Sequence, residues 1–214
     1  MKSKRILMCV IGVMVCAISV GFFKLAAFGV DPFQTFMSGM DQLIPIDFGT
    51  LYVIVNVVLL LFSLIFDRHY IGLATFINLF LLGYVVDFSH NTLLAIFPDA
   101  SMPIRCVSFV IGFVALCFSS SLYMTADLGV STYDAVAIIM ANTWKLGQFK
   151  FIRIATDVCC VIIGCSLYLL GGGEWAAIPT IAGFGTIVTA FCMGPLIDFF
   201  NRTFSVPNLE KANK

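Results

Sequence analysis

Apolar residues dominate six stretches of the chain, and short polar connections separate these stretches. A helix needs about 20 mostly apolar residues to cross the lipid core of a membrane. Five stretches come close to or exceed that length, and the second stretch is the shortest. The pattern therefore predicts an all-α, polytopic membrane protein with six transmembrane helices, at residues 5–27, 51–66, 71–88, 104–126, 152–170 and 178–199.

Two motifs in the first half of the chain recur in the second half. Gly-x-(Ala/Gly)-Thr starts at Gly72 and at Gly183, and Gly-x-x-x-Asp-Phe starts at Gly83 and at Gly194, in both cases 111 positions later. Upstream, an offset of 100 positions aligns Arg5 with Arg105, Gly12 with Gly112, Ser19 with Ser119 and Gly29-Val30 with Gly129-Val130. The chain is therefore interpreted as a tandem duplication.

We expect one membrane domain of residues 1–214, with repeat 1 at about 1–100, repeat 2 at about 101–202 and a polar tail at 203–214. Each repeat contributes three spans, which is an odd number, so the second repeat enters the membrane from the opposite side. This predicts inverted repeats related by a pseudo-two-fold axis in the membrane plane.

In each repeat, the sequence also predicts a short helix after the first span. These helices are expected at residues 31–43 and 131–144. Asp31 and Ser131 are suitable N-cap residues, and each follows a glycine that can end the preceding helix. A helix of about 12 residues is roughly 18 Å long, which is too short to cross a core of about 30 Å. We expect interfacial or re-entrant helices, and the sequence does not decide between these and spanning helices.

The distribution of basic residues predicts the orientation. With a cytoplasmic N-terminus, ten of the twelve Lys and Arg residues fall on the inner side, and only Lys24 and Arg105 fall outside. Cytoplasmic connections of membrane proteins are enriched in Lys and Arg. We therefore expect both termini to be cytoplasmic.

Composition agrees with a membrane protein and excludes other classes. The chain is 60% hydrophobic and 11% charged with a mean hydropathy of +1.03, whereas soluble domains contain about 25% charged residues. A net charge of zero argues against nucleic-acid binding. The eight cysteines and two histidines lack metal-ligand spacing, so we expect no metal and no cofactor. No motif for catalysis is present, and we do not expect an enzyme.

Small and polar residues share one face of the third and sixth predicted spans. Small residues let helix backbones approach closely in lipid, so a packing seam is expected at Gly72, Thr75, Gly83, Gly183, Thr186 and Gly194. The same arcs end at Asp87 and Asp198. These aspartates either lie at headgroup level with local hydrogen bonds or belong to a gate or proton-linked site.

Three further pairs of polar residues occupy matched positions in the two repeats. They are Asn56 with Asp157, Asn78 with Thr189, and Gln34 with Asp134. Polar groups inside a membrane need partners, so these side chains either bond neighbouring helices or line a central cavity. An anion site at the N-termini of the short helices is disfavoured because Asp31 and Asp134 already place negative charge there.

The Gly-Val-x-x-(Phe/Tyr) motif after the first span and the two motifs at the end of each half, together with six helices in about 210 residues, resemble the YczE/YyaS-like integral membrane proteins of bacteria. That group is loosely similar to the YitT family. The resemblance covers nearly the whole chain and implies a multi-pass protein of the bacterial inner membrane. It implies no substrate and no functional residues.

Inverted repeats with short capped helices and matched polar residues are typical of secondary transporters. The leading hypothesis is a small-solute transporter or permease-like protein with a site at the repeat interface. The alternatives are a non-transporting accessory or scaffold membrane protein, and a substrate-binding membrane subunit of a larger importer. Expected partners are the lipid bilayer and a small-molecule substrate, and the small volume of one chain is compatible with a homodimer or a membrane partner protein.

Overall fold

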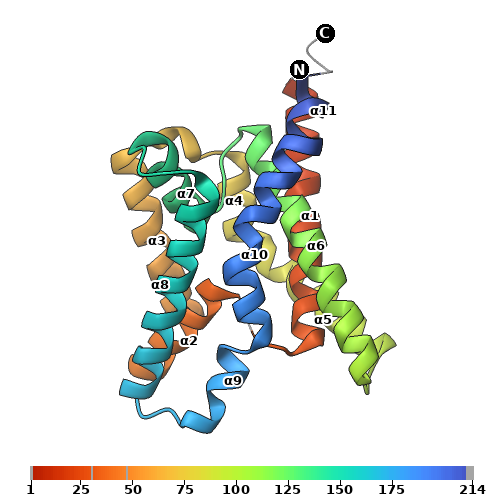
Figure 1. The fold of residues 1–214 in the computed structure, drawn as a ribbon, viewed down its shortest axis with the longest axis vertical. Coiled ribbons are helices and arrows are strands. Elements are labelled where there is room, and N and C mark those ends of the chain that lie inside the picture. Colours follow the sequence, from red (N-terminus) through yellow and green to blue (C-terminus); the bar gives the residue numbers. More distant parts are fainter. Residues whose placement is uncertain (1, 30, 47, 211–214) are drawn as a thin grey trace.

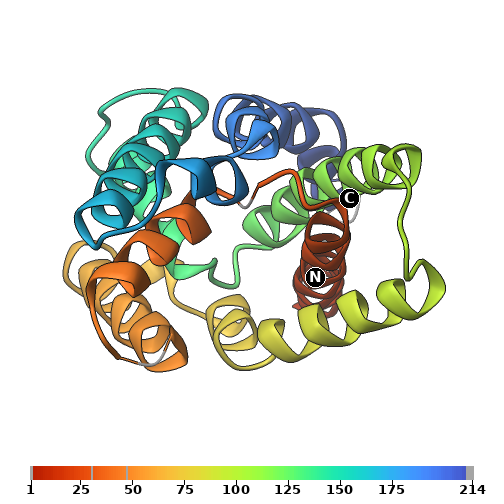
Figure 2. The ribbon, with the colours of Figure 1, turned by 90° about the horizontal axis from the view of Figure 1, so that it is seen from below.

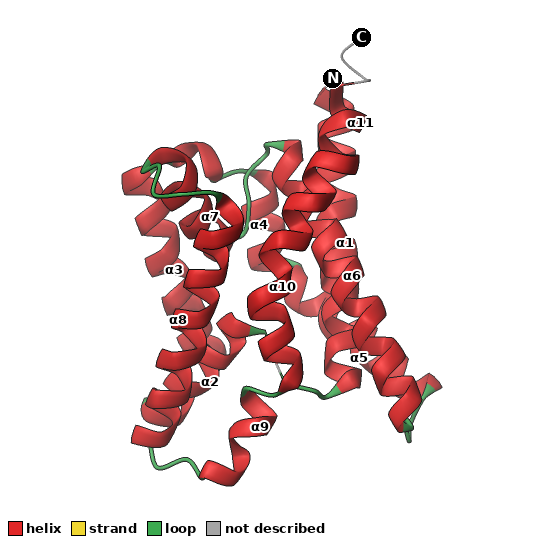
Figure 3. Cartoon of the chain, viewed as in Figure 1, coloured by secondary structure: helices red, strands yellow, loops and turns green. Residues whose placement is uncertain are grey.

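The structure is a computed structural model that describes residues 2–29, 31–46 and 48–210. Its regular elements, within these ranges, are helices joined by short loops (Figure 3). The longer helices are α1 (Lys2–Ala26), α2 (Pro32–Leu43), α3 (Phe48–Phe66), α4 (Leu73–Phe80), α5 (Leu82–Ile96), α6 (Met102–Ala126), α7 (Thr132–Ile138), α8 (Phe149–Leu170) and α10 (Phe184–Phe200). Short helices are η1 (Arg68–Tyr70), η3 (Trp175–Ala177), α9 (Ile178–Ile181) and α11 (Val206–Glu210). The predicted all-α fold class is confirmed.

Four helices are long and apolar enough to span a membrane. They are α1, α6, α8 and the continuous helix that runs from α10 to Leu209. The α4–α5 pair meets the same test jointly but bends by 56°. Helix α3 is apolar over Thr50–Phe66 and shorter than the other spans. Each of the six predicted stretches is thus helical, while the described residues contain four clear spans, or five if the bent pair counts as one.

The predicted span at 71–88 differs most from the structure. It is broken between Phe80 and Leu82, and α5 then continues through Ile96 into the segment expected to be a loop. Gly83 lies just beyond the break, and glycine weakens a helix locally. Ser89 fixes the extension against α1, because its hydroxyl donates to the Ile18 carbonyl at 3.2 Å.

The expected polar tail is helical as far as Glu210. A π-helical turn, η4 (Asn201–Ser205), connects α10 to α11. Ser205 is fully buried, and its hydroxyl lies 2.5 Å from the Ser121 hydroxyl on α6. Packing against α6 therefore extends the ordered helix beyond the point where the apolar pattern ends.

Both short capped helices are present where the sequence predicts them. The Asp31 carboxylate accepts hydrogen bonds from the backbone N–H groups of Phe33 and Gln34, each at 3.1 Å. Ser131 caps α7 by accepting from the Asp134 N–H at 3.1 Å. Helix α7 then continues as a π-helical segment, η2 (Ile139–Thr143). In Figure 1, α2 lies in the lower half of the molecule and α7 lies in the upper half. Both chain termini are also at the upper end.

Contacts between the halves occur in matched pairs. The Phe28 carbonyl accepts from the Gly185 N–H at 2.7 Å, and the Leu128 carbonyl, 100 positions after Phe28, accepts from the Ala74 N–H at 3.0 Å. Gly185 lies 111 positions after Ala74. The loop after the first helix of each half therefore bonds the start of the last helix of the other half.

Arg5 and Arg105, which are 100 positions apart, also contact the opposite half of the chain. Arg5 pairs with Asp127 at the end of α6 at 3.3 Å, and Arg105 donates to the Ala26 and Ala27 carbonyls at the end of α1, at 2.8 and 2.9 Å. Ala27 and Asp127 both have positive φ angles, of 51° and 57°. Each arginine thus holds the C-terminus of the opposite long helix.

The helices assemble into two groups that each contain elements of both halves. Helices α1, α4, α5, α6 and α10 pack around the α1–α6 pair, and α2, α3, α7 and α8 pack against one another. Seen from below in Figure 2, the second group lies at the left and the α1–α6 pair at the right. Helix α10 also contacts α8 and joins the groups. The natural units of the fold are therefore these two mixed groups and not the two halves.

Candidate functional site

A cavity of about 560 Å³ lies between the two helix groups. Helices of both groups and both halves contribute to its wall, from α1 and α2 through α10. Its polar and ionisable lining includes Asp31, Asn56, Asn78, Ser120, Asp134 and Arg153. Pockets of a few hundred Å³ with a few convergent polar groups in an apolar wall are typical small-molecule sites.

Arg153 is the central charged residue of this cavity. It lies in the first turns of α8, and its guanidinium binds two carboxylates, with Nε donating to Asp157 Oδ2 at 3.2 Å and Nη1 pairing with Asp134. Asp157 follows Arg153 by four residues, which places both side chains on one helix face. Arg153, Asp134 and Asp157 are only 4%, 3% and 0% exposed, so this is a fully buried ion-pair cluster.

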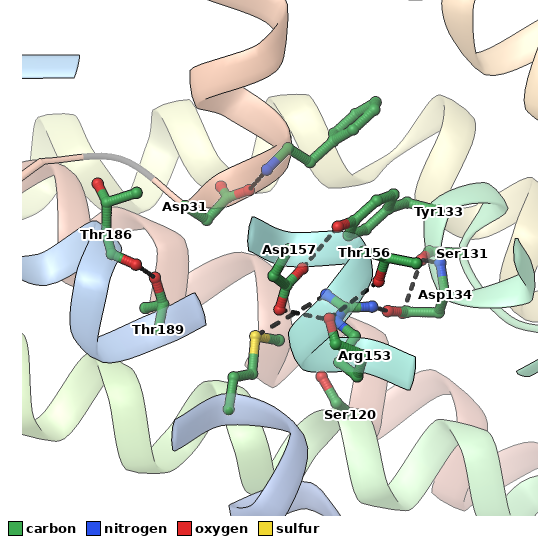
Figure 4. Close-up of polar contacts among 12 residues, drawn as sticks. Asp31, Ser120, Ser131, Tyr133, Asp134, Arg153, Thr156, Asp157, Thr186 and Thr189 are labelled. Carbon is green, nitrogen blue, oxygen red and sulfur yellow. Dashed lines mark hydrogen bonds and ion pairs between the residues drawn. The ribbon is translucent and has the colours of Figure 1, made fainter. Parts of the chain in front are cut away.

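Hydroxyl groups satisfy the outer oxygens of the two carboxylates. Tyr133 donates to Asp157 Oδ1 at 2.5 Å, and its ring lies 4.5 Å from the Arg153 guanidinium carbon. Ser131 and Tyr123 both donate to Asp134 Oδ2, with Ser131 at 2.6 Å. Figure 4 shows the aspartates on two sides of the guanidinium. The Met193 sulfur lies 3.9 Å from Nη2.

The cluster carries excess negative charge. One guanidinium and two carboxylates give the cluster a net charge of −1. Asp31 and Lys24 add one carboxylate and one amine to the cavity wall, so the charge of the whole region is also −1. Buried charges are stable only when paired and hydrogen-bonded. The structure meets that requirement within the cluster, yet it leaves the cavity as a whole electronegative.

Asp31 differs from the other two carboxylates because it accepts hydrogen bonds from backbone N–H groups at the start of α2. It is partly exposed and lies in the connection between α1 and α2, where it caps α2 (Figure 4). Burial raises the pKa of the Asp31 carboxyl to about 6, and its hydrogen bonds to the Gln34 and Phe33 N–H groups oppose this rise. Asp157 raises the same pKa and Arg153 lowers it.

The matched positions in the first half are neutral. At offsets of 100 and 101, Asp134 and Asp157 correspond to Gln34 and Asn56, and Arg153 corresponds to Tyr52. The Asn56 side chain joins the two halves. Its Oδ1 atom accepts from the Thr132 hydroxyl at 2.6 Å, and its Nδ2 atom donates to the Tyr52 backbone carbonyl at 2.8 Å. Only the second half thus places ionised groups at these positions.

The structure brings together five of the eight polar residues proposed from the sequence. Gln34, Asn56, Asn78 and Asp134 line the cavity, and Asp157 lies directly behind its wall, bound to Arg153. Thr189 is buried and donates within its own helix, to the Gly185 and Thr186 carbonyls.

Asp198, one of the two seam aspartates, does not join this cluster. Asp198 pairs with Arg202 at 3.0 Å and lines a second cavity, of about 590 Å³, near the N-terminal end of α1. That cavity also contains the His69–Asp127 contact, at 2.6 Å. Asp87 lies within α5, and its side chain falls outside the described residues.

The seam positions lie where backbones approach closely. A Cβ atom on Gly183 would clash with the Phe28 carbonyl, and one on Gly72 with the Leu128 carbonyl. Gly194 lies against the Lys150 carbonyl in the same way. Thr75 donates to the Val130 carbonyl at 2.6 Å, and Thr186 is fully buried. Gly83 lies outside the residues whose surroundings are described.

Sequence reasoning missed three members of the cluster, Arg153, Tyr133 and Tyr123. It assigned Arg153 to the basic residues on the inner side of the membrane, whereas the structure buries this residue. The signal was the i, i+4 spacing of Arg153 and Asp157 in an apolar helix, because two opposite charges at that spacing form a pair on one face. The tyrosines carry no comparable signal.

Several apolar helices of spanning length, arranged around a buried ion-pair cluster, define a multi-pass α-helical membrane protein. The chain belongs to the family of unknown function DUF6198, whose model matches residues 3–202. It is also similar to the uncharacterized membrane protein YczE of Bacillus subtilis (strain 168), with 24% identity over 174 residues, covering 81% of this chain and 74% of the relative. No solved structure matches the chain significantly.

Proposed function

We propose that this protein transports a small solute across the bacterial inner membrane and binds it in the cavity between the two helix groups. The observation that carries this proposal is the cavity itself, because its wall combines the buried Arg153 cluster with neutral polar groups from the other half. Polar and ionisable groups buried in membrane proteins are costly, and they most often mark a substrate or ion pathway.

The proposal includes inverted repeats, with the halves threaded through the membrane in opposite senses. The exchanged contacts support it, since Phe28 bonds Gly185 while Leu128 bonds Ala74. The placement of α2 and α7 toward opposite ends of the molecule supports it as well (Figure 1). The basic residues favour cytoplasmic termini. Six spans then follow if α3 and the α4–α5 pair each cross the membrane.

The cavity would open alternately to the two sides of the membrane, because the α4–α5 pair and its matched helix α10 differ in shape. In the first half, the helix is broken between Phe80 and Leu82, and this break borders the cavity beside the exposed Phe80 and Tyr84. In the second half, α10 is unbroken, but it contains Gly194-Pro195, which matches Gly83-Tyr84 just beyond the break in the first half. Proline removes a helix hydrogen bond and provides a bending point. Bending of α10 with straightening of α4–α5 would open the cavity to the other side.

The test is a metabolite thermal-shift screen of the purified full-length protein, followed by uptake of each hit into proteoliposomes. We expect Asn78→Leu to weaken both binding and uptake, because Asn78 lines the cavity and its side-chain amide donates to the Ala74 carbonyl of its own helix. Asn91→Leu is the matched control, since Asn91 is an exposed asparagine on α5. A screen without hits, combined with a reproducible protein partner in pull-downs, would contradict transport and favour the accessory role.

A further inference from the structure

We propose that the cavity binds a monovalent organic cation, an amine or quaternary ammonium compound. This inference rests on the proposed solute site and adds the chemical class of the solute. Its basis is the coincidence, in one cavity, of uncompensated negative charge with a set of aromatic rings.

The charge of the cavity favours a cation. Its ionisable wall contains the carboxylates of Asp31 and Asp134, the Arg153 guanidinium and Lys24, with Asp157 directly behind the wall. Counting all five groups gives a net charge of −1. Of the two basic groups, Arg153 is buried and Lys24 is exposed. A bound monocation therefore brings the net charge of the region from −1 to zero. A bound anion would instead increase the uncompensated negative charge.

Arg153 does not provide a vacant anion site. Two of its nitrogens already bind Asp157 and Asp134, and Nη2 faces the Met193 sulfur at 3.9 Å. An anion at Nη2 would lie close to two buried carboxylates of the same sign. The guanidinium therefore acts as the internal counterion of the two aspartates.

Aromatic rings in the cavity wall also favour a cation. Phe33, Tyr52 and Tyr133 line the cavity as a contiguous set, with Phe33 stacked on Tyr133 at 5.0 Å and edge-on to Tyr52 at 6.0 Å. The Arg153 guanidinium already lies over the Tyr133 ring, so this set accommodates a planar cation in the structure itself. Aromatic faces attract cations, and aromatic cages are a recurring solution for quaternary ammonium groups.

The size and lining of the cavity favour an organic cation over a metal ion. A volume of about 560 Å³ is far larger than the compact oxygen shell that a small inorganic cation requires. The wall also contains apolar groups, including Val20, Leu79 and Leu116, which suit the methyl or methylene groups of an alkylammonium compound. Asn78 lines the same wall and suits a hydroxyl or carbonyl elsewhere on the solute.

The experiment uses the purified full-length protein in detergent and measures binding by calorimetry, with thermal shift as a second readout. The probes are tetramethylammonium, tetraethylammonium and choline, compared with 3,3-dimethyl-1-butanol as the neutral isostere of choline, and with sodium and acetate ions. We expect saturable binding of at least one organic cation and no binding of its neutral isostere, of acetate or of sodium.

Two variants place the binding in the cavity. Asp31→Asn removes one carboxylate from the wall but keeps the cap of α2, because asparagine caps a helix as well as aspartate. We expect it to weaken cation binding by about tenfold or more. Asp41→Asn is the matched control, since Asp41 is an exposed acid on the same helix. Tyr52→Leu should weaken binding by about 5- to 30-fold, whereas Tyr52→Phe retains the ring and should bind normally.

Each outcome decides the inference. Absence of binding, equal stabilisation by sodium, or equal affinities in wild type, Asp31→Asn and Tyr52→Leu would overturn it. Uptake of a neutral or anionic solute that depends on Asn78 would leave the transport proposal intact and reject the organic cation. Cation binding in the cavity without any uptake or counterflow in proteoliposomes would reject transport and leave the cation site standing.

Discussion

The two halves of this chain share a scaffold but place different chemistry on it. In the second half, Arg153, Asp134 and Asp157 form a buried ion-pair cluster. In the first half, the matched residues are Tyr52, Gln34 and Asn56, which are neutral. By contrast, the loop contacts that join the halves are the same on both sides. Contacts that hold the scaffold together are thus duplicated, and the ionised site is not.

This difference assigns separate roles to matched residues. Replacing a buried ion pair by apolar residues of the same volume is often neutral or stabilising, so the proposed solute site gives a reason for the cluster that stability does not. The glycines and carbonyls at the crossing points have no such chemistry, and their identity in both halves follows from backbone geometry. Substitutions at matched positions can therefore test which differences between the halves have functional origins.

The largest effect is expected for Arg153→Met. Removing the guanidinium leaves two buried carboxylates without a counterion, and breaking a buried pair in this way costs about 3–5 kcal/mol. The matched substitution Tyr52→Met removes a ring that packs on Phe33 and should cost about 1–2 kcal/mol. Reversible unfolding in mixed detergent micelles measures both. Equal costs would contradict the account that the second half alone contains a charged cluster whose partners depend on Arg153.

A smaller but symmetrical effect is expected at the two crossing loops. Gly29 and Gly129 have φ angles of +104° and +91°, and a Cβ atom on either would clash with the backbone of Gly183 or Gly72. Backbone strain and overpacking together should cost each alanine variant about 2–4 kcal/mol. Gly172→Ala is the control, because Gly172 has φ +85° but open space around it, and it should lose only about 1 kcal/mol. Clearly different costs for Gly29→Ala and Gly129→Ala would break the symmetry of the scaffold.

The neutral bridge between the halves should contribute less. Asn56→Ala removes the acceptor of the Thr132 hydroxyl and leaves that buried group unpaired, at a cost of about 1–3 kcal/mol. Thr132→Val removes the donor instead, and the double variant should cost less than the sum of the two single variants. Additive costs in the same unfolding assay would show that the two side chains are not coupled.

The smallest effect is a pH dependence at Asp31. Because the folded-state pKa of Asp31 is raised to about 6, above the value of about 3.9 for a free aspartate, folding favours the protonated form. Its contribution to stability is complete below about pH 4 and is lost as the pH rises through 6. The Tm of wild type should therefore fall between pH 4 and 7 relative to that of Asp31→Asn. Parallel pH profiles for the two proteins would contradict the raised pKa.

Much of the fold was accessible from periodicity and capping chemistry. The apolar stretches predicted the helices, and Asp31 and Ser131 predicted both short helices, because these features depend on neighbouring residues alone. The break after Phe80 and the helical extension of the C-terminal tail to Glu210 were missed, since they depend on packing against distant helices. The matched polar pairs led to Asn56, Asp134 and Asp157, but Arg153 was overlooked because a basic residue near a helix end is usually explained by membrane orientation.

The central claim is that the two halves cross the membrane in opposite senses around one cavity. It is tested most directly by labelling single cysteines, introduced as Asp99→Cys and Gly147→Cys in a background without native cysteines, with a membrane-impermeant maleimide. Asp99 lies in the connection between α5 and α6, and Gly147 in the connection between η2 and α8. We predict that position 99 reacts in intact cells and that position 147 reacts only after the membrane is permeabilised. Reaction of both positions from the same side would contradict the inverted arrangement.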